Sequence, residues 1–478
     1  MTGVSFHDLY TLNIKSKGDD EMKTWNQLFI RYGWNLAEQE RNQFNCQGET
    51  EDNISFLVET LEKLGVAYQL DNQLLTVFDE PVVEQEWLKA IDFQHRGRTG
   101  FWFKPGEQEL KIRELDTFIS GVVRQLNRLG FYTDISCDGH DRSLPSIGLS
   151  KNVKFDQLEQ LFNAIGLDKV RICRERSPRI SFRLDRRQLP LVAEQLSTIE
   201  VAWLSQGEET IKKQLFFKTL EELLVIPGAS RNEGKIRQVV VEKLTPLVDY
   251  ITVDKYGNIL AEKTYRGGTG PTILLNAHLD IASEITENRE VIKDNQIWSS
   301  SEGILGADDR AGIAIILQLA KSLACSTFSG KVKYIFTVEE EIGLVGARHV
   351  EDYFLWGTDA AIVLDRRGTG DIVTSCGEFI PFCNAWYGEF FEDVAREEGL
   401  ADWQVTSGGS SDTGVWAKHG IESVNLSVGY NNEHMKYETL DVEAAYQTVK
   451  LVKGVFKRAR TLKSIQLSNL RNDIRQIG

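Results

Sequence analysis

The second half of the chain alternates apolar strands with helices, and this alternation restricts the fold more than any other feature. Segments with the composition of buried strands lie at 272–280, 331–338, 360–365 and 421–428. Helical patterns between and after them lie at 311–323, 390–399 and 441–459. Nearly continuous apolar strands separated by helices are typical of a largely parallel sheet covered on both faces. The sequence therefore predicts a three-layer α/β/α domain with a mostly parallel mixed sheet over residues 207–478.

The region before residue 207 has a different pattern. A polar stretch, "SQGEET", marks the boundary at 205–210. Residues 111–206 mix short strands with helices, which predicts a small α+β unit of ferredoxin-like type. Residues 1–110 form an amino-terminal α+β region of unknown role, with one clear helical pattern at 53–65. We expect this amino-terminal half to lie near the mouth of a site or to mediate assembly.

Composition excludes some partners. The 478 residues carry a net charge of −15, which argues against a nucleic-acid backbone as the partner. No uninterrupted apolar segment reads as a signal peptide or a membrane span. The six cysteines are scattered, as expected for reduced thiols. We therefore expect a cytoplasmic protein that does not bind membranes.

Metal-capable side chains lie at the end of each predicted strand of the second half or in the segment that follows it. They are His278, Asp280, Asp308, the three glutamates at 339–341, Asp365 and His434. A single such residue is usually a turn residue or a helix cap. Carboxylates crowded at one sheet edge would raise one another's pKa and destabilise the fold unless a cation were present. The carboxyl ends of parallel strands are also where ligands bind in such sheets.

The residue types indicate which cations would bind. Imidazole and carboxylate ligands without thiolate favour zinc, with cobalt and manganese as alternatives, in an open catalytic site. Two such ions can share a water and activate it. A neighbouring carboxylate that is not a ligand can accept the proton of that water. We expect one of the three adjacent glutamates to bind metal, another to act as the base, and the third to lie outside the site.

Several short motifs together resemble those of a known superfamily. "NAHLD", "GADDRAG", "EEIG", "VLD" and the late histidine occur in the order found in the dinuclear zinc exopeptidases, which include bacterial leucyl aminopeptidase, peptidase T and glutamyl aminopeptidase. The resemblance covers roughly residues 210–462. It implies a phosphorylase/hydrolase-like fold and metal-dependent hydrolysis at a free amino terminus. A short peptide or aminoacyl compound would be the substrate, and a homo-oligomer is expected.

The resemblance also implies a role for each site residue. His278 and Asp365 would hold one metal ion, and Glu341 and His434 the other. Asp308 would bridge the two ions. The intervals between these ligands are too short to hold an inserted domain.

Further roles follow from the same alignment of motifs. Glu340 would be the general base, and Asp280 would fix the tautomer of His278. The peptide bond after the bridging aspartate is often cis in this superfamily, so we predict a cis bond between Asp308 and Asp309.

Some interpretations remain open at this point. Arg366 and Arg367 could bind a substrate carboxylate or could form salt bridges within the acidic cluster. A deacylase or carboxypeptidase-type activity on N-acyl amino acids would use the same site, and a non-catalytic metal-binding regulatory module could retain the same fold. The motif "SCDGH" places Cys137, Asp138 and His140 close together and could begin a zinc site, but two further ligands would be needed and a turn is the favoured interpretation.

Overall fold

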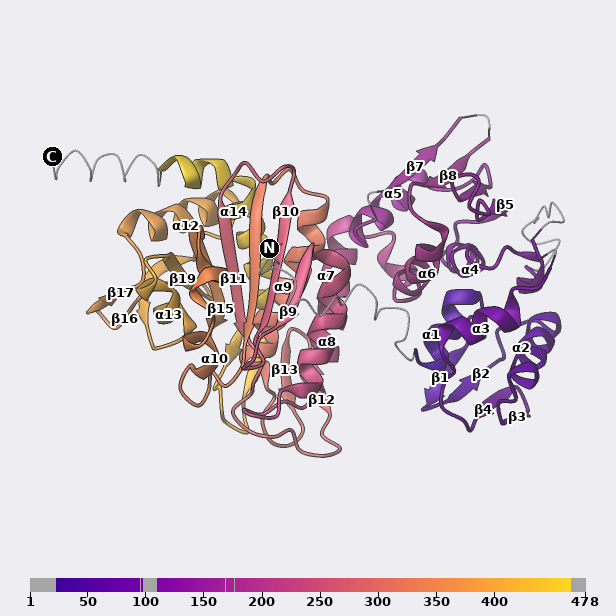
Figure 1. The fold of residues 1–478 in the computed structure, drawn as a ribbon, viewed down its shortest axis with the longest axis horizontal. Helices are drawn as coiled ribbons and strands as arrows, with labels where there is room; N and C mark the ends of the chain where they lie inside the picture. Colours follow the sequence, from indigo (N-terminus) through magenta and orange to yellow (C-terminus); the bar gives the residue numbers. More distant parts are fainter. Residues whose placement is uncertain (1–22, 95, 98–109, 168, 176, 466–478) are drawn as a thin grey trace, which may run out of the picture. The chain divides into compact units, whose positions relative to one another are not determined.

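A computed structural model describes residues 23–94, 96–97, 110–167, 169–175 and 177–465 (Figure 1). The chain divides into two compact units, residues 1–212 and 213–478. Among the described residues, no helix is both long enough and apolar enough to cross a membrane.

The amino-terminal unit contains the same arrangement of elements twice. The first copy comprises α1 (Trp25–Tyr32), β1 (Ala37–Glu40), β2 (Gln43–Asn45), α2 (Glu51–Leu64), β3 (Tyr68–Asp71), β4 (Leu74–Val77) and α3 (Glu84–Ile91). The second comprises α4 (Ser120–Arg128), β5 (Thr133–Cys137), β6 (Ser146–Leu149), α5 (Phe155–Ala164), β7 (Val170–Cys173), β8 (Arg179–Phe182) and α6 (Leu189–Ser197). Their sheets, β1-β2-β4-β3 and β5-β6-β8-β7, have equivalent orders and only antiparallel pairs.

This order differs from the ferredoxin-like arrangement expected for residues 111–206. A ferredoxin-like unit alternates β-α-β-β-α-β, whereas here a helix precedes, separates and follows two hairpins. Each strand of a hairpin pairs with its sequence neighbour, so no crossover through a helix is needed within a hairpin. The division of residues 1–206 at about residue 110 stays a prediction.

Helices α1, α4 and α6 join the two copies. A Cβ on Gly121 of α4 would lie 2.3 Å from the Arg31 backbone oxygen, so only glycine permits this close approach. The Arg31 guanidinium forms ion pairs with Glu84 at 3.0 Å and with Glu194 at 2.8 Å. Short helices (η2 Ile112–Glu114, η3 Arg186–Gln188 and η4 Val201–Trp203) complete the unit.

The carboxyl-terminal unit is built on a nine-stranded mixed sheet. Its main path runs β17 (Ile380–Pro381), β16 (Asp371–Cys376), β19 (Glu422–Ser427), β15 (Ala360–Arg366), β11 (Thr272–His278), β14 (Gly330–Thr337), β10 (Ile259–Tyr265) and β9 (Tyr250–Val253), and β18 (Gln404–Gly408) pairs with β16. The central strands β14, β11, β15 and β19 are parallel. These strands are apolar and almost wholly buried, as expected for strands covered on both faces.

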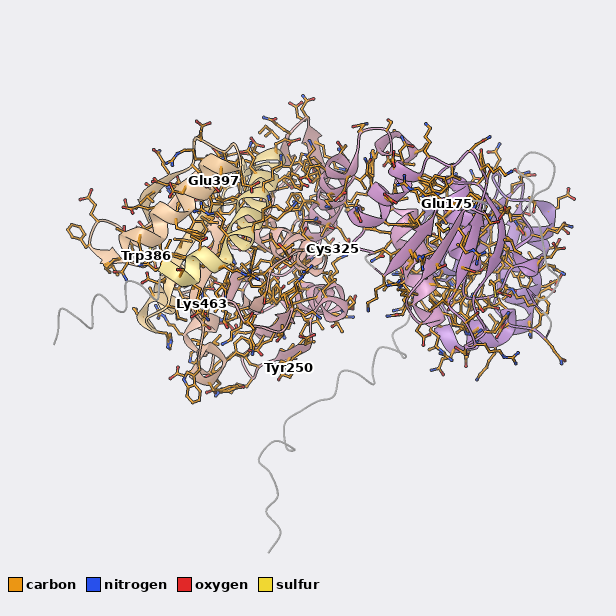
Figure 2. All side chains as sticks on the ribbon, turned by 90° about the horizontal axis from the view of Figure 1, so that it is seen from above. Glu175, Tyr250, Cys325, Trp386, Glu397 and Lys463 are labelled. Carbon is orange, nitrogen blue, oxygen red and sulfur yellow. The ribbon has the colours of Figure 1, made fainter. Side chains whose placement is uncertain are left out.

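Helices cover both faces of this sheet, which confirms the predicted three layers. On one face α9 (Ala307–Ala324), α12 (Ala385–Glu397) and α14 (Val442–Lys457) contact the strands or one another. On the other face α10 (Val345–Arg348), α11 (Asp352–Leu355) and α13 (Asp412–Lys418) share one buried cluster with strand side chains such as Leu274 and Ile335. Figure 2 labels Trp386 and Glu397 near the two ends of α12.

The remaining elements of this unit frame its edges. Helix α7 (Glu208–Leu224) spans the boundary between the units, and α8 (Gly234–Leu244) and η5 (Thr245–Leu247) follow it. A second sheet has the order β12-β13-β21-β20, formed by β12 (Val291–Asp294), β13 (Ile297–Ser300), β21 (Thr439–Asp441) and β20 (Tyr430–Asn431). The loop from β20 to β21 contains His434, and the hydrogen bonds of this small sheet fix both ends of that loop.

Candidate metal centre

The predicted site residues meet at the carboxyl ends of three neighbouring parallel strands. His278 is the last residue of β11, Asp365 lies near the end of β15, and the glutamates at 339–341 follow β14. Asp308 lies at the start of α9, and His434 lies in the loop between β20 and β21. The topology therefore brings together side chains that are far apart in the sequence.

Asp308 lies between the two histidines. Its Oδ1 is 3.0 Å from His278 Nε2, and its Oδ2 is 3.2 Å from His434 Nε2. The carboxylate thus presents one oxygen to each imidazole. The peptide bond between Asp308 and Asp309 is cis, which confirms the prediction.

The other two predicted ligands complete the two sides of Asp308. His434 Nε2 lies 2.9 Å from Glu341 Oε2. His278 Nε2 lies 3.6 Å from Asp365 Oδ1. His278 and Asp365 therefore group on one side of Asp308, and Glu341 and His434 group on the other.

Asp280 connects His278 to the turn of glutamates. Its carboxylate is 3.4 Å from His278 Nδ1, and it accepts hydrogen bonds from the backbone N–H groups of Glu340 at 3.0 Å and Glu341 at 3.1 Å. The Ser230 hydroxyl also donates to it at 2.7 Å. Because Asp280 is fully buried, these contacts fix the histidine ring and the glutamate turn relative to each other.

Three further residues support the cluster and were not predicted. Both oxygens of buried Asp309 accept backbone hydrogen bonds, from His278 at 3.2 Å and from Gly312 at 3.0 Å. The Tyr430 hydroxyl donates to Asp365 Oδ1 at 3.0 Å. Buried Glu438 accepts from the N–H groups of Gly306 and Asp308. One sequence signal existed for Asp309, its position beside the predicted bridging aspartate, whereas Tyr430 and Glu438 are identified by their contacts alone.

The electrostatics of the cluster reflect its crowded carboxylates. Burial alone would raise the pKa of Asp308, but hydrogen bonds with His278 and His434 outweigh burial and hold that pKa well below its usual range. Burial raises the pKa of Asp365 to about 6. Hydrogen bonds with Asp308 and Glu341 raise the pKa of His434 to about 10. The two imidazoles are therefore held among more acidic groups than they can neutralise.

Among the carboxyl groups with a predicted role in the mechanism, that of Glu340 has the most strongly shifted pKa. Burial raises its pKa to about 10, and the negative charges of Asp365, Asp412 and Asp308 act in the same direction. A cation in the cluster would offset this repulsion and favour the ionised carboxylate.

The donor set fits divalent cations. Ligand atoms of His278, Asp308 and Glu341 lie within 4.8 Å of one another, as do those of His278, Asp309 and Asp365. Glu341 Oε1 is buried and has no hydrogen-bond partner among the described residues. A buried carboxylate oxygen without a hydrogen-bond partner, in a group that also contains imidazole, is suited to a metal ion. Asp309 is a poorer ligand than Asp308 because the backbone already uses both of its oxygens.

The two arginines after Asp365 have acidic partners. Arg366 Nε donates to Asp371 at 2.9 Å, and Arg367 donates to Glu433 at 2.9 Å. Neither partner belongs to the metal-capable cluster. A contact of either guanidinium with a substrate carboxylate stays a prediction.

The chain is similar to several known proteins. The sequence profile of the M42 glutamyl aminopeptidase family matches residues 285–451. The protein YqjE of Bacillus subtilis strain 168 is 30% identical over 360 residues, covering 50% of this chain and 96% of YqjE. Peptidase T of Clostridium botulinum is 30% identical over 142 residues, covering 28% of this chain and 34% of that protein. The crystal structure of aminopeptidase PepT from Bacillus cereus is 19% identical, with a TM-score of 0.48, and covers 52% of this chain and 98% of that chain.

A mainly parallel sheet with this cluster at its strand ends defines a metal-dependent hydrolase of the α/β/α class. The chain belongs to the dinuclear zinc exopeptidase superfamily, and its residues 285–451 match the profile of the M42 aminopeptidases. It is accordingly a metal-dependent aminopeptidase, as the resemblance in sequence implied.

Proposed function

We propose that this chain removes amino-terminal residues from short peptides with two zinc ions held by the cluster around Asp308. His278 and Asp365 would hold one ion, Glu341 and His434 the other, and Asp308 both. The observation that carries the proposal is the carboxylate of Asp308, with one oxygen toward each histidine at 3.0 and 3.2 Å. Such ions supply Lewis acidity for the scissile carbonyl and lower the pKa of the attacking water.

The protein's own groups then move the proton. Glu340 is the proposed general base: its carboxylate takes a proton from the attacking water and returns it to the leaving amine. The hydrogen bond from the Glu340 backbone N–H to Asp280 fixes the backbone from which this side chain extends. Asp280 is a positioning residue, because it orients His278 and the glutamate turn.

The acidic surroundings of the cluster support the preference for a free amino terminus. The substrate's free α-amino group would lie near Asp365, where the acidic surroundings as a whole favour a positively charged amine over a blocked one. Arg366 and Arg367 pair with Asp371 and Glu433, so binding of an N-acyl substrate's carboxylate would require them to exchange these partners. We also propose the cytoplasm as the compartment, which fits the scattered cysteines, and a homo-oligomer as the assembly.

A comparison of two neighbouring glutamates tests the proposed base. Glu340→Gln should lower kcat by roughly 100-fold or more and keep the metal content, because the amide cannot accept the proton. Glu339→Gln is the matched control, since the Glu339 carboxylate lies 3.8 Å from Arg231 and outside the cluster. Aminoacyl and N-acyl substrates should be assayed with and without a chelator. Full turnover by Glu340→Gln would overturn the assignment, and faster cleavage of N-acyl substrates would overturn the aminopeptidase preference.

A further inference from the structure

The amino-terminal unit contains a second group of metal-capable side chains. Ligand atoms of Asp116, Cys137 and His140 lie within 4.8 Å of one another. Cys137 ends β5, His140 lies in the turn that follows, and Asp116 lies in the segment before α4. The fold therefore supplies a third ligand, Asp116, which lies twenty-one positions before Cys137 and outside the motif "SCDGH".

The Asp116 carboxylate is buried and incompletely satisfied. The residue is 3% exposed, and its Oδ1 accepts no hydrogen bond among the described residues. Its Oδ2 accepts the backbone N–H of Asp138 at 2.9 Å, which fixes the carboxylate against the turn. A Cβ on Gly97 would lie 1.6 Å from Oδ1, so the backbone packs directly against this oxygen and only glycine fits there. The Cys137 thiol interacts with this carboxylate, and a metal ion bound between the two groups would take the place of the thiol proton.

The turn presents the other two ligand atoms toward the same place. His140 Nε2 lies 3.4 Å from Asp116 Oδ1, while His140 Nδ1 lies 3.5 Å from Asp138 Oδ1. A carboxylate beside one ring nitrogen leaves the other nitrogen free for a metal ion. Burial and the neighbouring carboxylates raise the pKa of the Cys137 thiol, whereas the Gly139 N–H, which donates to Cys137 Sγ at 3.3 Å, acts in the opposite direction. Gly139, His140 and Asp141 all have positive φ, so the chain reverses sharply at this turn.

Arginine side chains near the group are engaged elsewhere. Arg186 pairs with Asp138 at 3.2 Å and with Asp141 at 3.3 Å. The buried Arg96 guanidinium donates to the backbone oxygens of Leu115, Ile91 and Ile112. In the part of the chain that the structure describes, His140 is the one basic side chain paired with Asp116. Among the described residues, no lysine or arginine forms an ion pair with the Asp116 carboxylate itself, which leaves that carboxylate to His140 and to an ion.

We propose that Asp116, Cys137 and His140 bind a zinc ion, independently of the catalytic cluster, with water at the fourth position. Thiolate, imidazole and carboxylate together are a donor set that zinc prefers, and four-coordinate zinc with three protein ligands keeps one open position. The Cys137 thiol releases its proton to solvent when the ion binds. The ion joins the segment before α4 to the end of β5, so its role is to fix these two parts of the second copy.

Cobalt distinguishes this site from the catalytic one. No ligand proposed for the catalytic cluster contains sulfur, so a thiolate-to-cobalt charge-transfer band in the near ultraviolet reports on Cys137. The full chain should be stripped of metal with a chelator and titrated with Co²⁺. We expect the band in the wild-type protein and in Cys173→Ser, whose cysteine is exposed on β7 of the same unit. Cys137→Ser should lose the band and bind one metal ion fewer per chain than Cys173→Ser.

A measurement on the wild-type protein covers the case in which Cys137→Ser does not fold. Alkylation followed by peptide mass mapping compares the rates at Cys137 and Cys173 with and without Zn²⁺. Zinc should slow alkylation of Cys137 at least tenfold and leave Cys173 unchanged. Three results would overturn the site: no charge-transfer band in wild-type protein, a band that persists in Cys137→Ser, or equal alkylation of Cys137 with and without zinc.

Discussion

The backbone N–H of Glu340 donates to Asp280 Oδ1 at 3.0 Å. Asp280 therefore holds the backbone of the proposed base, and its carboxylate also faces the ring of His278. The same carboxylate accepts the N–H of Glu341, the proposed ligand on the other side of Asp308. One buried side chain thus contacts a proposed ligand on each side of Asp308 and the backbone of the proposed base.

Removal of Asp280 should therefore affect turnover more than substrate binding. Asp280→Ala releases the glutamate turn and the His278 ring together, and we expect a 10- to 100-fold loss of kcat with a smaller change in KM. Ser230→Ala, which removes only one donor to Asp280, should have a weaker effect. Steady-state kinetics on an aminoacyl substrate measures both. A loss confined to KM would contradict a positioning role.

Metal content should depend on which ligand is removed. Because Asp308 faces both histidines, Asp308→Ala should lose both ions of the catalytic cluster. Asp365→Ala should retain the ion on the side of Glu341 and His434. Metal analysis after gel filtration gives the stoichiometry, and a Cys137→Ser background removes the contribution of the amino-terminal group. Equal losses in the two variants would show that Asp308 is not shared.

The hydroxyl of Tyr430 should tune metal affinity. Tyr430→Phe removes the donor to Asp365 Oδ1 while the ring still fills the core, so we expect roughly tenfold weaker metal binding. Tyr387→Phe is a matched control, because the buried Tyr387 hydroxyl donates to the Ala361 backbone oxygen instead. Competition with a chelator of known affinity measures the difference. Unchanged affinity in Tyr430→Phe would contradict this role.

Stability at alkaline pH should depend on Lys333. Its ammonium donates to the backbone oxygens of Phe354 at 2.5 Å and Trp356 at 2.7 Å, at the end of α11. Burial lowers its pKa from 10.5 to about 8, so between these values the unfolded chain binds the proton and the folded chain does not. The free energy of unfolding therefore gains a contribution as pH rises from 8 to 10.5.

Lys333→Met removes this contribution. The wild-type protein should gain stability relative to the variant between pH 8 and 10, as measured by the midpoint of denaturant unfolding at each pH. A difference between the two proteins that stays constant with pH would contradict the shifted pKa.

The catalytic fold could be predicted from the sequence because its signals are local. Buried parallel strands such as 272–278 are continuous apolar runs. Each ends at or just before a polar side chain, such as His278, that needs water or a metal ion as a partner. Glu438 and Tyr430 could not be predicted in this way. Their roles depend on which backbone N–H and which carboxylate oxygen they meet, and that is decided by packing between elements far apart in the chain.

The amino-terminal unit was predicted less well for a related reason. Its two copies share an order of elements rather than residues, as α2 with "FLVETLEKL" and α5 with "FDQLEQLFNA" illustrate. Repetition of hydrophobic positions at uneven spacing gives no fixed period in the sequence. Asp116 was missed as a partner of Cys137 because the contact is made across the unit and not within a motif.

The hairpins of the amino-terminal unit and the parallel strands of the carboxyl-terminal unit have opposite consequences for the order of folding. Hairpins pair neighbours in the chain and form quickly, whereas β11 pairs with β14 and β15 only after long intervening segments have been synthesised. We therefore expect the first unit to reach its native state on the ribosome while the catalytic sheet is still incomplete.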